Sequence, residues 1–152
     1  MYALCISSEP HMLVKTLFLL WCLTFFVLGA LHAAYTITDT WRPKKLVPSK
    51  PEVAAAMRSS TLALTKETDM WSAWVGFNIS HSLGLLFYSS VYAYLAIFQF
   101  SVLVSSIPLL AGAPLIALLY LVLSKKYWFS IPATGSLIGF LCFGGGALAT
   151  AV

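Results

Sequence analysis

The fold is decided by the stretch from Asp69 to Phe98, which reads DMWSAWVGFNISHSLGLLFYSSVYAYLAIF. It is longer than the roughly 20 apolar residues that a helix needs to cross a bilayer. Wound as a helix, it has two distinct faces, because side chains three or four positions apart lie on the same side. One face carries small residues at every fourth position: Gly76, Ser80 and Gly84. Such a stripe lets helix backbones approach closely, so we expect it to pack against a neighbouring helix.

The second face carries the polar chemistry. Along it, aromatic and polar residues recur every three or four positions: Trp71, Trp74, Asn78, His81, Leu85, Tyr88 and Tyr92. Ionisable and polar side chains are costly inside a bilayer, and they mark functional sites by default. Asn78 and His81 are therefore the first candidates for a functional site. The alternative is a neutral histidine that locks helix packing through a hydrogen bond to a neighbour.

The composition of the chain indicates an integral membrane protein. Of its 152 residues, 60% are hydrophobic and only 9% are charged, and the mean hydropathy is +0.88. Soluble domains carry about 25% charged residues because their surface must be solvated. The net charge of +4 does not indicate nucleic-acid binding, since the few basic residues flank apolar segments. Three scattered cysteines fit neither a disulfide framework nor a zinc site, so we expect no metal centre built on them.

Three further apolar segments accompany the central one. We expect one integral membrane domain over residues 1–152, with transmembrane helices at about 12–35, 70–98, 102–124 and 130–151. A signal peptide is the competing interpretation of the first segment, but its apolar run is longer than a signal peptide needs. Pro108 and Pro114 should bend the third helix. The predicted fold is an all-α four-helix transmembrane bundle.

The polar loop at residues 36–69 indicates how the bundle is oriented. A short amphipathic helix that begins near Pro51 is expected to lie on the membrane surface within this loop. With four spans, the loop and the Lys125–Lys126 turn lie on the same side of the membrane. The loop and this turn together hold eight of the nine Lys and Arg residues. The positive-inside rule then predicts cytoplasmic basic loops and both termini outside, in a bacterial inner membrane.

Aromatic and polar residues on the basic side outline a candidate ligand pocket. Its candidate residues are His32, Trp74, Asn78, His81, Ser82, Tyr88 and Trp128. The aromatic members also fit an ordinary belt at the membrane interface. The pocket interpretation predicts binding of a lipid-like ligand or of a partner membrane subunit. Gly135 and Gly139 of the fourth helix are expected to pack against the stripe at Gly76, Ser80 and Gly84.

Two other functions are compatible with the same residues. A small intramembrane enzyme would use His81 as general acid or base on a lipid-like substrate, with Asn78 orienting it. Alternatively, His32 and His81 could approach each other as the two axial ligands of a haem. The sequence contains no nucleophile elbow, P-loop or H-E-x-x-H motif, so it does not decide whether the protein is an enzyme.

The motif around His81 resembles a known family. The segments WSAWVGFNISHSLG (71–84) and KKYWFSIP (125–132) are similar to segments in a family of small four-helix bacterial integral membrane proteins of unknown function. The residues that carry the likeness are Trp71, Trp74, Gly76, Phe77, Asn78, Ser80, His81, Ser82, Gly84, Tyr127, Trp128, Phe129 and Pro132. In layout the likeness covers nearly the whole chain. It implies the four-helix bundle and a special status for the Asn78/His81 turn, and it implies no activity.

Overall fold

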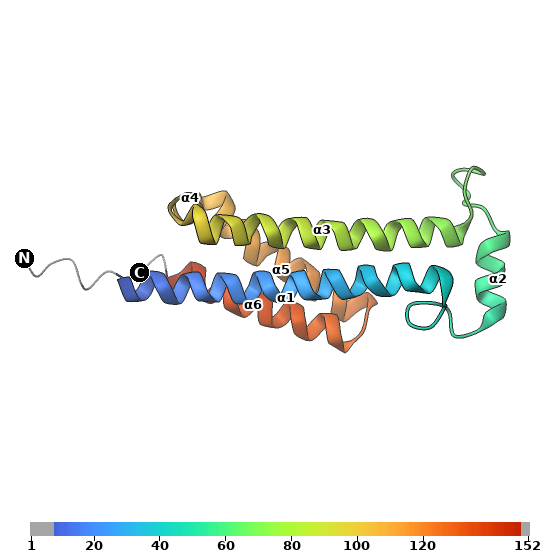
Figure 1. Ribbon diagram of the computed structural model, residues 1–152, viewed down its shortest axis with the longest axis horizontal. Coiled ribbons are helices and arrows are strands. Elements are labelled where there is room, and N and C mark those ends of the chain that lie inside the picture. The colour runs from blue at the N-terminus through green and yellow to red at the C-terminus, as the bar shows by residue number, and fades with distance from the viewer. Residues whose placement is uncertain (1–7, 150–152) are drawn as a thin grey trace, which may run out of the picture. The chain divides into compact units, whose positions relative to one another are not determined.

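The computed structural model describes residues 8–149, with side chains from Met12 onward, and these residues form helices joined by short connections (Figure 1). The helices are α1 (Ser8–Trp41), α2 (Pro51–Ser59), α3 (Met70–Phe98), α4 (Phe100–Ser105), α5 (Ile107–Tyr127) and α6 (Ser130–Ala149). Four of them, α1, α3, α5 and α6, are long and apolar enough to cross a membrane. The predicted all-α fold, with four candidate transmembrane helices and a short helix in the first loop, is confirmed.

The first helix is longer than predicted. It ends at Trp41 rather than near residue 35, so the polar loop begins only at Arg42. In the sequence these added turns resemble a loop, because they are rich in threonine. The hydroxyls of Thr36, Thr38 and Thr40 donate to carbonyl oxygens three or four residues earlier, at 2.7–2.9 Å. These bonds satisfy the polar side chains within the helix itself.

The third predicted helix is divided in two. Residue Ser106 separates α4 from α5 and has an extended backbone, with φ −97° and ψ 103°. Pro108 lies in the first turn of α5, where its missing N–H removes no helical hydrogen bond. Pro108 therefore marks the start of a helix instead of bending one, and Pro114 is the proline inside α5.

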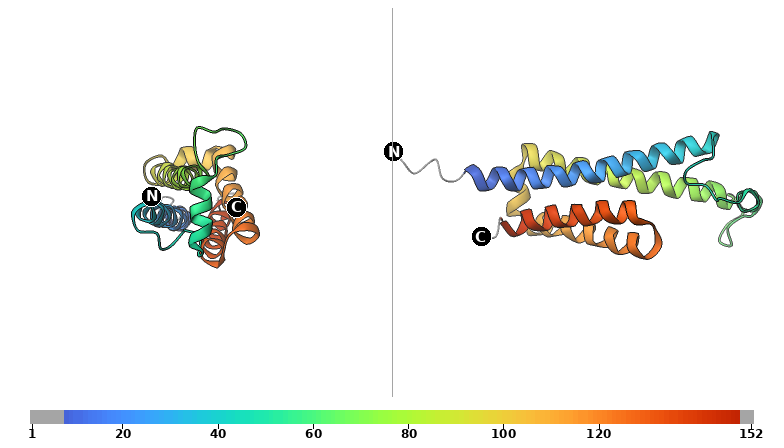
Figure 2. Two further views of the ribbon diagram at one scale, coloured as in Figure 1. Left: turned by 90° about the vertical axis from the view of Figure 1, so that its right-hand side faces the viewer. Right: turned by 90° about the horizontal axis from the view of Figure 1, so that it is seen from below.

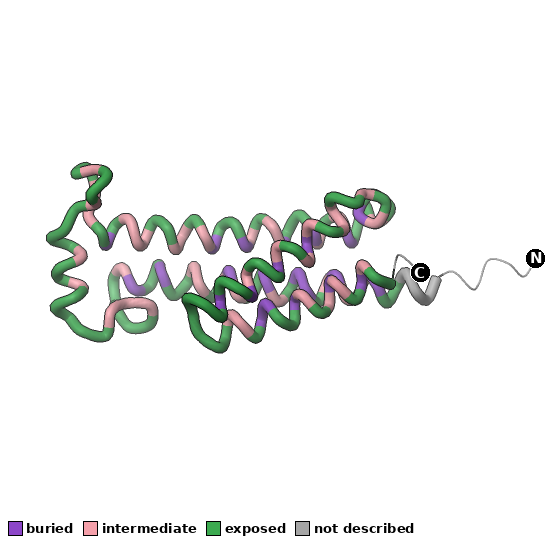
Figure 3. Tube along the Cα trace, turned by 180° about the vertical axis from the view of Figure 1, so that it is seen from behind, coloured by how far each residue is buried: buried purple, intermediate pink, exposed green. Residues whose placement is uncertain are grey.

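The chain forms two compact units, which are described separately. The first unit contains α4, α5 and α6, together with the part of α1 up to Leu28 and the part of α3 from Phe87. Within it, α5 and α6 run side by side in opposite directions (Figure 2). Buried positions recur along these helices between exposed ones, as expected for helices with one packed and one outward face (Figure 3).

Trp21 lies at the centre of the first unit. Its indole is fully buried and is surrounded by the rings of Phe25, Tyr88, Tyr92 and Phe143, with centroid separations of 4.8–5.5 Å. Three of these four ring pairs are edge-to-face, which is a favoured geometry for aromatic contacts.

Glycines of α6 allow it to approach these aromatic side chains closely. A Cβ added at Gly139 would lie 2.5 Å from Phe25 Cε2 and 2.6 Å from Trp21 Cδ1. A Cβ added at Gly135 would lie 2.5 Å from Leu28 Cδ1. Gly135 and Gly139 are thus buried where α6 meets α1, and their neighbours there are large side chains.

Within the second unit, the small-residue stripe of α3 does not pack against α1. A Cβ added at Gly76 or Gly84 would meet no atom within 4 Å in the described part of the chain, and Ser80 is exposed. The physical reason is the orientation of α3. Asn78, Ser82 and Leu85 face α1, so the stripe lies about half a turn away at 100° per residue.

Close approach in the second unit is made by Gly29, a residue that the sequence did not single out. This unit comprises residues 29–86. In it, the end of α1 and the start of α3 run antiparallel, and the loop that joins them contains α2 (Figure 1). A Cβ added at Gly29 would lie 3.0 Å from Leu85 Cβ and 3.3 Å from the carbonyl oxygen of Ser82.

Carboxylates order both ends of the loop in the second unit. Asp39 is 1% exposed and accepts hydrogen bonds from the backbone N–H groups of Lys44, Lys45 and Leu46 at 2.5–3.1 Å. Asp69 caps α3, because it accepts the Ser72 N–H at 2.7 Å and the Ser72 hydroxyl at 3.2 Å. The bonds from Ser72 hold the pKa of the Asp69 carboxyl below its usual value.

Candidate functional site

His32 of α1 and Asn78 of α3 are joined by a hydrogen bond. His32 Nε2 lies 2.9 Å from Asn78 Oδ1. The amide is oriented by a second bond, in which Asn78 Nδ2 donates to the carbonyl oxygen of Trp74 at 2.7 Å. Because Oδ1 can only accept, the hydrogen of this pair sits on His32 Nε2. In a neutral imidazole, Nδ1 of His32 is then a hydrogen-bond acceptor.

His81 completes this group, which we call the imidazole–amide cluster (His32, Asn78 and His81). The ring of His81 meets the ring of His32 edge to face, with centroids 5.5 Å apart and planes at 79°. On its other side it lies along Phe77, one turn earlier in α3, with centroids 6.4 Å apart. Phe77 is 68% exposed, and His81 is half-buried. His81 therefore lies between the partly buried Asn78 and the exposed Phe77.

Trp74 and Ser82 belong to the surroundings of the cluster, in different roles. The Trp74 ring is stacked on Trp71 at 5.3 Å, and the Arg58 guanidinium lies 4.4 Å from the Trp71 ring centroid, which links α2 to α3. Ser82 is fully buried, and its hydroxyl donates to the carbonyl oxygen of Asn78 at 2.9 Å. Ser82 therefore supports the helix backbone beside Gly29, whereas the sequence interpretation placed it on a pocket wall.

The two remaining candidates belong to the first unit. Tyr88 donates its hydroxyl to the carbonyl oxygen of Ala113 at 3.2 Å, and its ring packs against Trp21. Trp128 lies beside the ring of Tyr120, with centroids 6.2 Å apart. Among the sequence candidates, the second unit thus brings together His32, Trp74, Asn78, His81 and Ser82.

Gly29 and Phe77 are the site residues that the sequence interpretation missed. Gly29 lies three positions before His32, so it shares a face of α1 with that histidine. The three-residue spacing from His32 is the signal in the sequence that places Gly29 beside the cluster. Phe77 lies four positions before His81, at the spacing that places two side chains next to each other on a helix.

The cluster can donate and accept hydrogen bonds through its two imidazole rings and its amide. Among the residues that the structure describes, no group of three or more His, Cys, Asp or Glu side chains comes together as a candidate metal site. Comparisons of the chain with protein-family models, curated proteins and solved structures find no match.

Proposed function

We propose that this integral membrane protein binds the polar group of a lipid-like ligand at the imidazole–amide cluster. The observation that carries the proposal is the 2.9 Å contact between His32 and Asn78, with the ring of His81 placed against it. Polar groups in a membrane span cost free energy unless they have partners, and such groups mark ligand or ion sites by default. Because His81 is only half-buried, a ligand in the bilayer could reach its imidazole beside the bonded pair.

The chemistry of the cluster indicates what the ligand carries. A neutral imidazole offers one donor and one acceptor, which suits a hydroxyl or a carbonyl group. The apolar remainder of the ligand would stay along the exposed surface of α3 at Phe77. Asn78 acts as a positioning residue, because its bond to His32 selects the tautomer of that ring. The proposed resemblance to the small four-helix family rests largely on the residues around Asn78 and His81, so it supports a functional role for this turn of α3.

The substitution His81→Leu tests the proposal. Leucine keeps much of the apolar bulk and removes both ring nitrogens, so we expect the variant to fold with an unchanged melting temperature and to lose its co-purifying ligand. Native mass spectrometry from mild detergent and thermal melting on the same sample measure both properties. Leu83→Ala is the matched control, because Leu83 is 60% exposed on the same helix and lies outside the cluster.

Two results would speak against ligand binding. If His81→Leu loses about 1–3 kcal/mol of stability, the histidine satisfies a buried polar partner and has a packing role. If the variant carries everything that the wild type carries, the cluster is not the binding site. A product mass formed from the bound molecule would instead identify an enzyme with His81 as general acid or base.

The contact between the two imidazoles also favours a second candidate, a bis-histidine haem site. Ligation of iron through His32 Nε2 would have to replace the bond from this atom to Asn78. This candidate predicts a coloured protein whose visible absorbance disappears in both His32→Leu and His81→Leu. A colourless wild-type protein purified from cells supplied with haem would contradict it.

We further propose that the first loop and the Lys125–Lys126 turn face the cytoplasm of a bacterial cell, with both termini outside. The support is the distribution of Lys and Arg, eight of nine of which lie in these two connections. Ser49 is exposed in the loop. A Ser49→Cys variant without the natural cysteines should react with a membrane-impermeant thiol reagent only after the cells are opened. Reaction in intact cells would reverse the orientation.

A further inference from the structure

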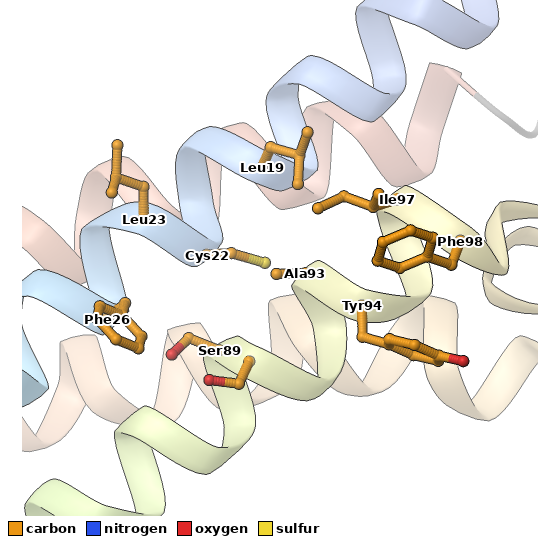
Figure 4. Close-up of a pocket in the computed structure, with 10 residues that line it drawn as sticks. Leu19, Cys22, Leu23, Phe26, Ser89, Ala93, Tyr94, Ile97 and Phe98 are labelled. Atoms are coloured by element: carbon orange, nitrogen blue, oxygen red, sulfur yellow. The ribbon is translucent and has the colours of Figure 1, made fainter.

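A groove of about 430 Å³ opens on the first unit between α1 and α3 (Figure 4). Leu19, Leu23 and Phe26 line it from α1, and Ala93 and Ile97 line it from α3. Leu23, Phe26 and Ile97 are 58%, 45% and 46% exposed, so the groove is open to the surroundings of the protein. Its volume is in the range of about 300–1,000 Å³ that is typical of small-molecule sites.

Lys15 places a positive charge at one end of this groove. Its Nζ donates to the carbonyl oxygen of Ile97 at 3.1 Å, and Ile97 lines the groove. Lys15 also lies one helical turn before Leu19, on the same stripe of α1. An ammonium group has three N–H donors, so the bond to Ile97 leaves two for another acceptor.

We propose that the groove holds one acyl chain of an anionic glycerophospholipid and that the phosphate of this lipid pairs with Lys15. The apolar walls of the groove match an acyl chain, and the ammonium group of Lys15 at its end matches the anionic headgroup joined to that chain. The two helices that form the groove are long and apolar enough to cross a bilayer, where lipid would surround it. This site is separate from the imidazole–amide cluster, whose residues all belong to the second unit.

A second copy of the chain fits the groove less well. Four of the five acidic residues lie between Asp39 and Asp69, in the second unit, and the fifth is Glu9. A neighbouring copy would therefore have few carboxylates to place against Lys15 while filling the groove with apolar side chains. A phospholipid supplies both groups in one molecule.

The charge on Lys15 is tested by competition between two lipids. The full chain is purified in mild detergent and mixed with equal amounts of phosphatidylglycerol and phosphatidylcholine that carry the same acyl chains, and bound lipid is read by native mass spectrometry. We expect about a fivefold preference for phosphatidylglycerol, as one lysine near an anionic lipid provides. Lys15→Gln should reduce the ratio to about one without reducing the total lipid bound, whereas Lys15→Arg should keep it. Lys125→Gln, which removes an exposed charge elsewhere, is the matched control.

The groove itself is tested by filling it. Ala93→Phe should remove the retained lipid of either kind, while Leu141→Phe, on the exposed face of α6, should retain it. If Ala93→Phe lowers the melting temperature, Ser90→Phe is the groove-filling variant to use instead, because Ser90 lies at the exposed rim of the same groove. His81→Leu should leave the preference for phosphatidylglycerol unchanged. The proposal for the groove and the proposal for the imidazole–amide cluster can therefore fail independently.

Three results would overturn the proposal. The first is a wild-type protein that binds both lipids equally. The second is a Lys15→Gln variant that keeps the wild-type preference, or a groove-filling variant that retains as much lipid as the wild type. The third is a wild-type dimer that Ala93→Phe converts to a monomer with no change in bound lipid, because the occupant would then be a second copy of the chain.

Discussion

Replacing Gly139 by alanine should destabilise the protein by about 1–3 kcal/mol, although alanine is the better helix former. The added Cβ would lie 2.5 Å from Phe25 Cε2 and 2.6 Å from Trp21 Cδ1. Both rings are fully or almost fully buried among other aromatic side chains, so neither can withdraw without disturbing the core of the first unit. Overpacking of this kind forces side chains from their preferred rotamers.

Two other glycines of α6 provide a graded control for Gly139. At Gly144 an added Cβ meets nothing within 4 Å in the described part of the chain, so alanine should leave stability unchanged or raise it by up to about 1 kcal/mol. At Gly135 the Cβ meets the end of the flexible Leu28 side chain, so the cost should be intermediate. Thermal melting of the three variants in one detergent measures the order. Equal melting temperatures for Gly139→Ala and Gly144→Ala would show that α6 does not pack on α1 as described.

Replacing Trp21 by alanine should have the largest effect of any single truncation considered, about 3–5 kcal/mol. The indole is fully buried, and removing it leaves a cavity lined by aromatic rings that cannot collapse together. Trp21→Phe should cost much less, because the indole N–H has no hydrogen-bond partner among the described residues. Its removal therefore leaves no acceptor unsatisfied.

Leu23→Ala is the control for Trp21→Ala, because Leu23 lies nearby on α1 and is 58% exposed. Its truncation should change stability by a few tenths of a kcal/mol, as is usual at surface positions. Chemical or thermal unfolding in detergent, monitored by a probe other than tryptophan fluorescence, compares the variants. If Trp21→Ala is no less stable than Leu23→Ala, the aromatic core around Trp21 does not hold the first unit together.

Long apolar segments were enough to predict the four candidate spans. The bounds of the central helix, Met70–Phe98, agree with the sequence prediction, because apolar residues continue up to a capping carboxylate at one end and a polar break at the other. The end of α1 was not predictable in this way. Its threonines hydrogen bond within their own helix, and in a sequence they are the same residues that mark a loop.

Periodicity showed that α3 has two faces, but it did not show which face meets another helix. The small-residue stripe was expected at the contact, yet the polar face turns toward α1, where Asn78 bonds to His32 and Ser82 lies against Gly29. At this contact the hydrogen bond between Asn78 and His32 occurs together with close packing, which Gly29 of α1 permits in place of the stripe on α3. The possible approach of His32 to His81 was part of the sequence interpretation, and the structure places their rings in contact.

Other features leave no short-range pattern in a sequence. Asp39 has backbone N–H groups as its partners, five to seven residues later, and any residue type except proline can supply them. The groove beside Lys15 arises only from the combination of α1 and α3, and its residues look like ordinary lipid-facing positions in either helix alone.

Histidine-selective ¹⁵N NMR of the protein in lipid nanodiscs is the most direct test of ligand binding at the imidazole–amide cluster. The chain has only three histidines, so the spectrum is simple, and His32→Leu and His81→Leu assign the two rings of the cluster. We expect extraction of the co-purified ligand to shift the ¹⁵N resonances of the His81 ring nitrogens and of His32 Nδ1, and adding the ligand back to restore them. Spectra of His32 and His81 that are identical with and without the ligand would contradict ligand binding at the cluster.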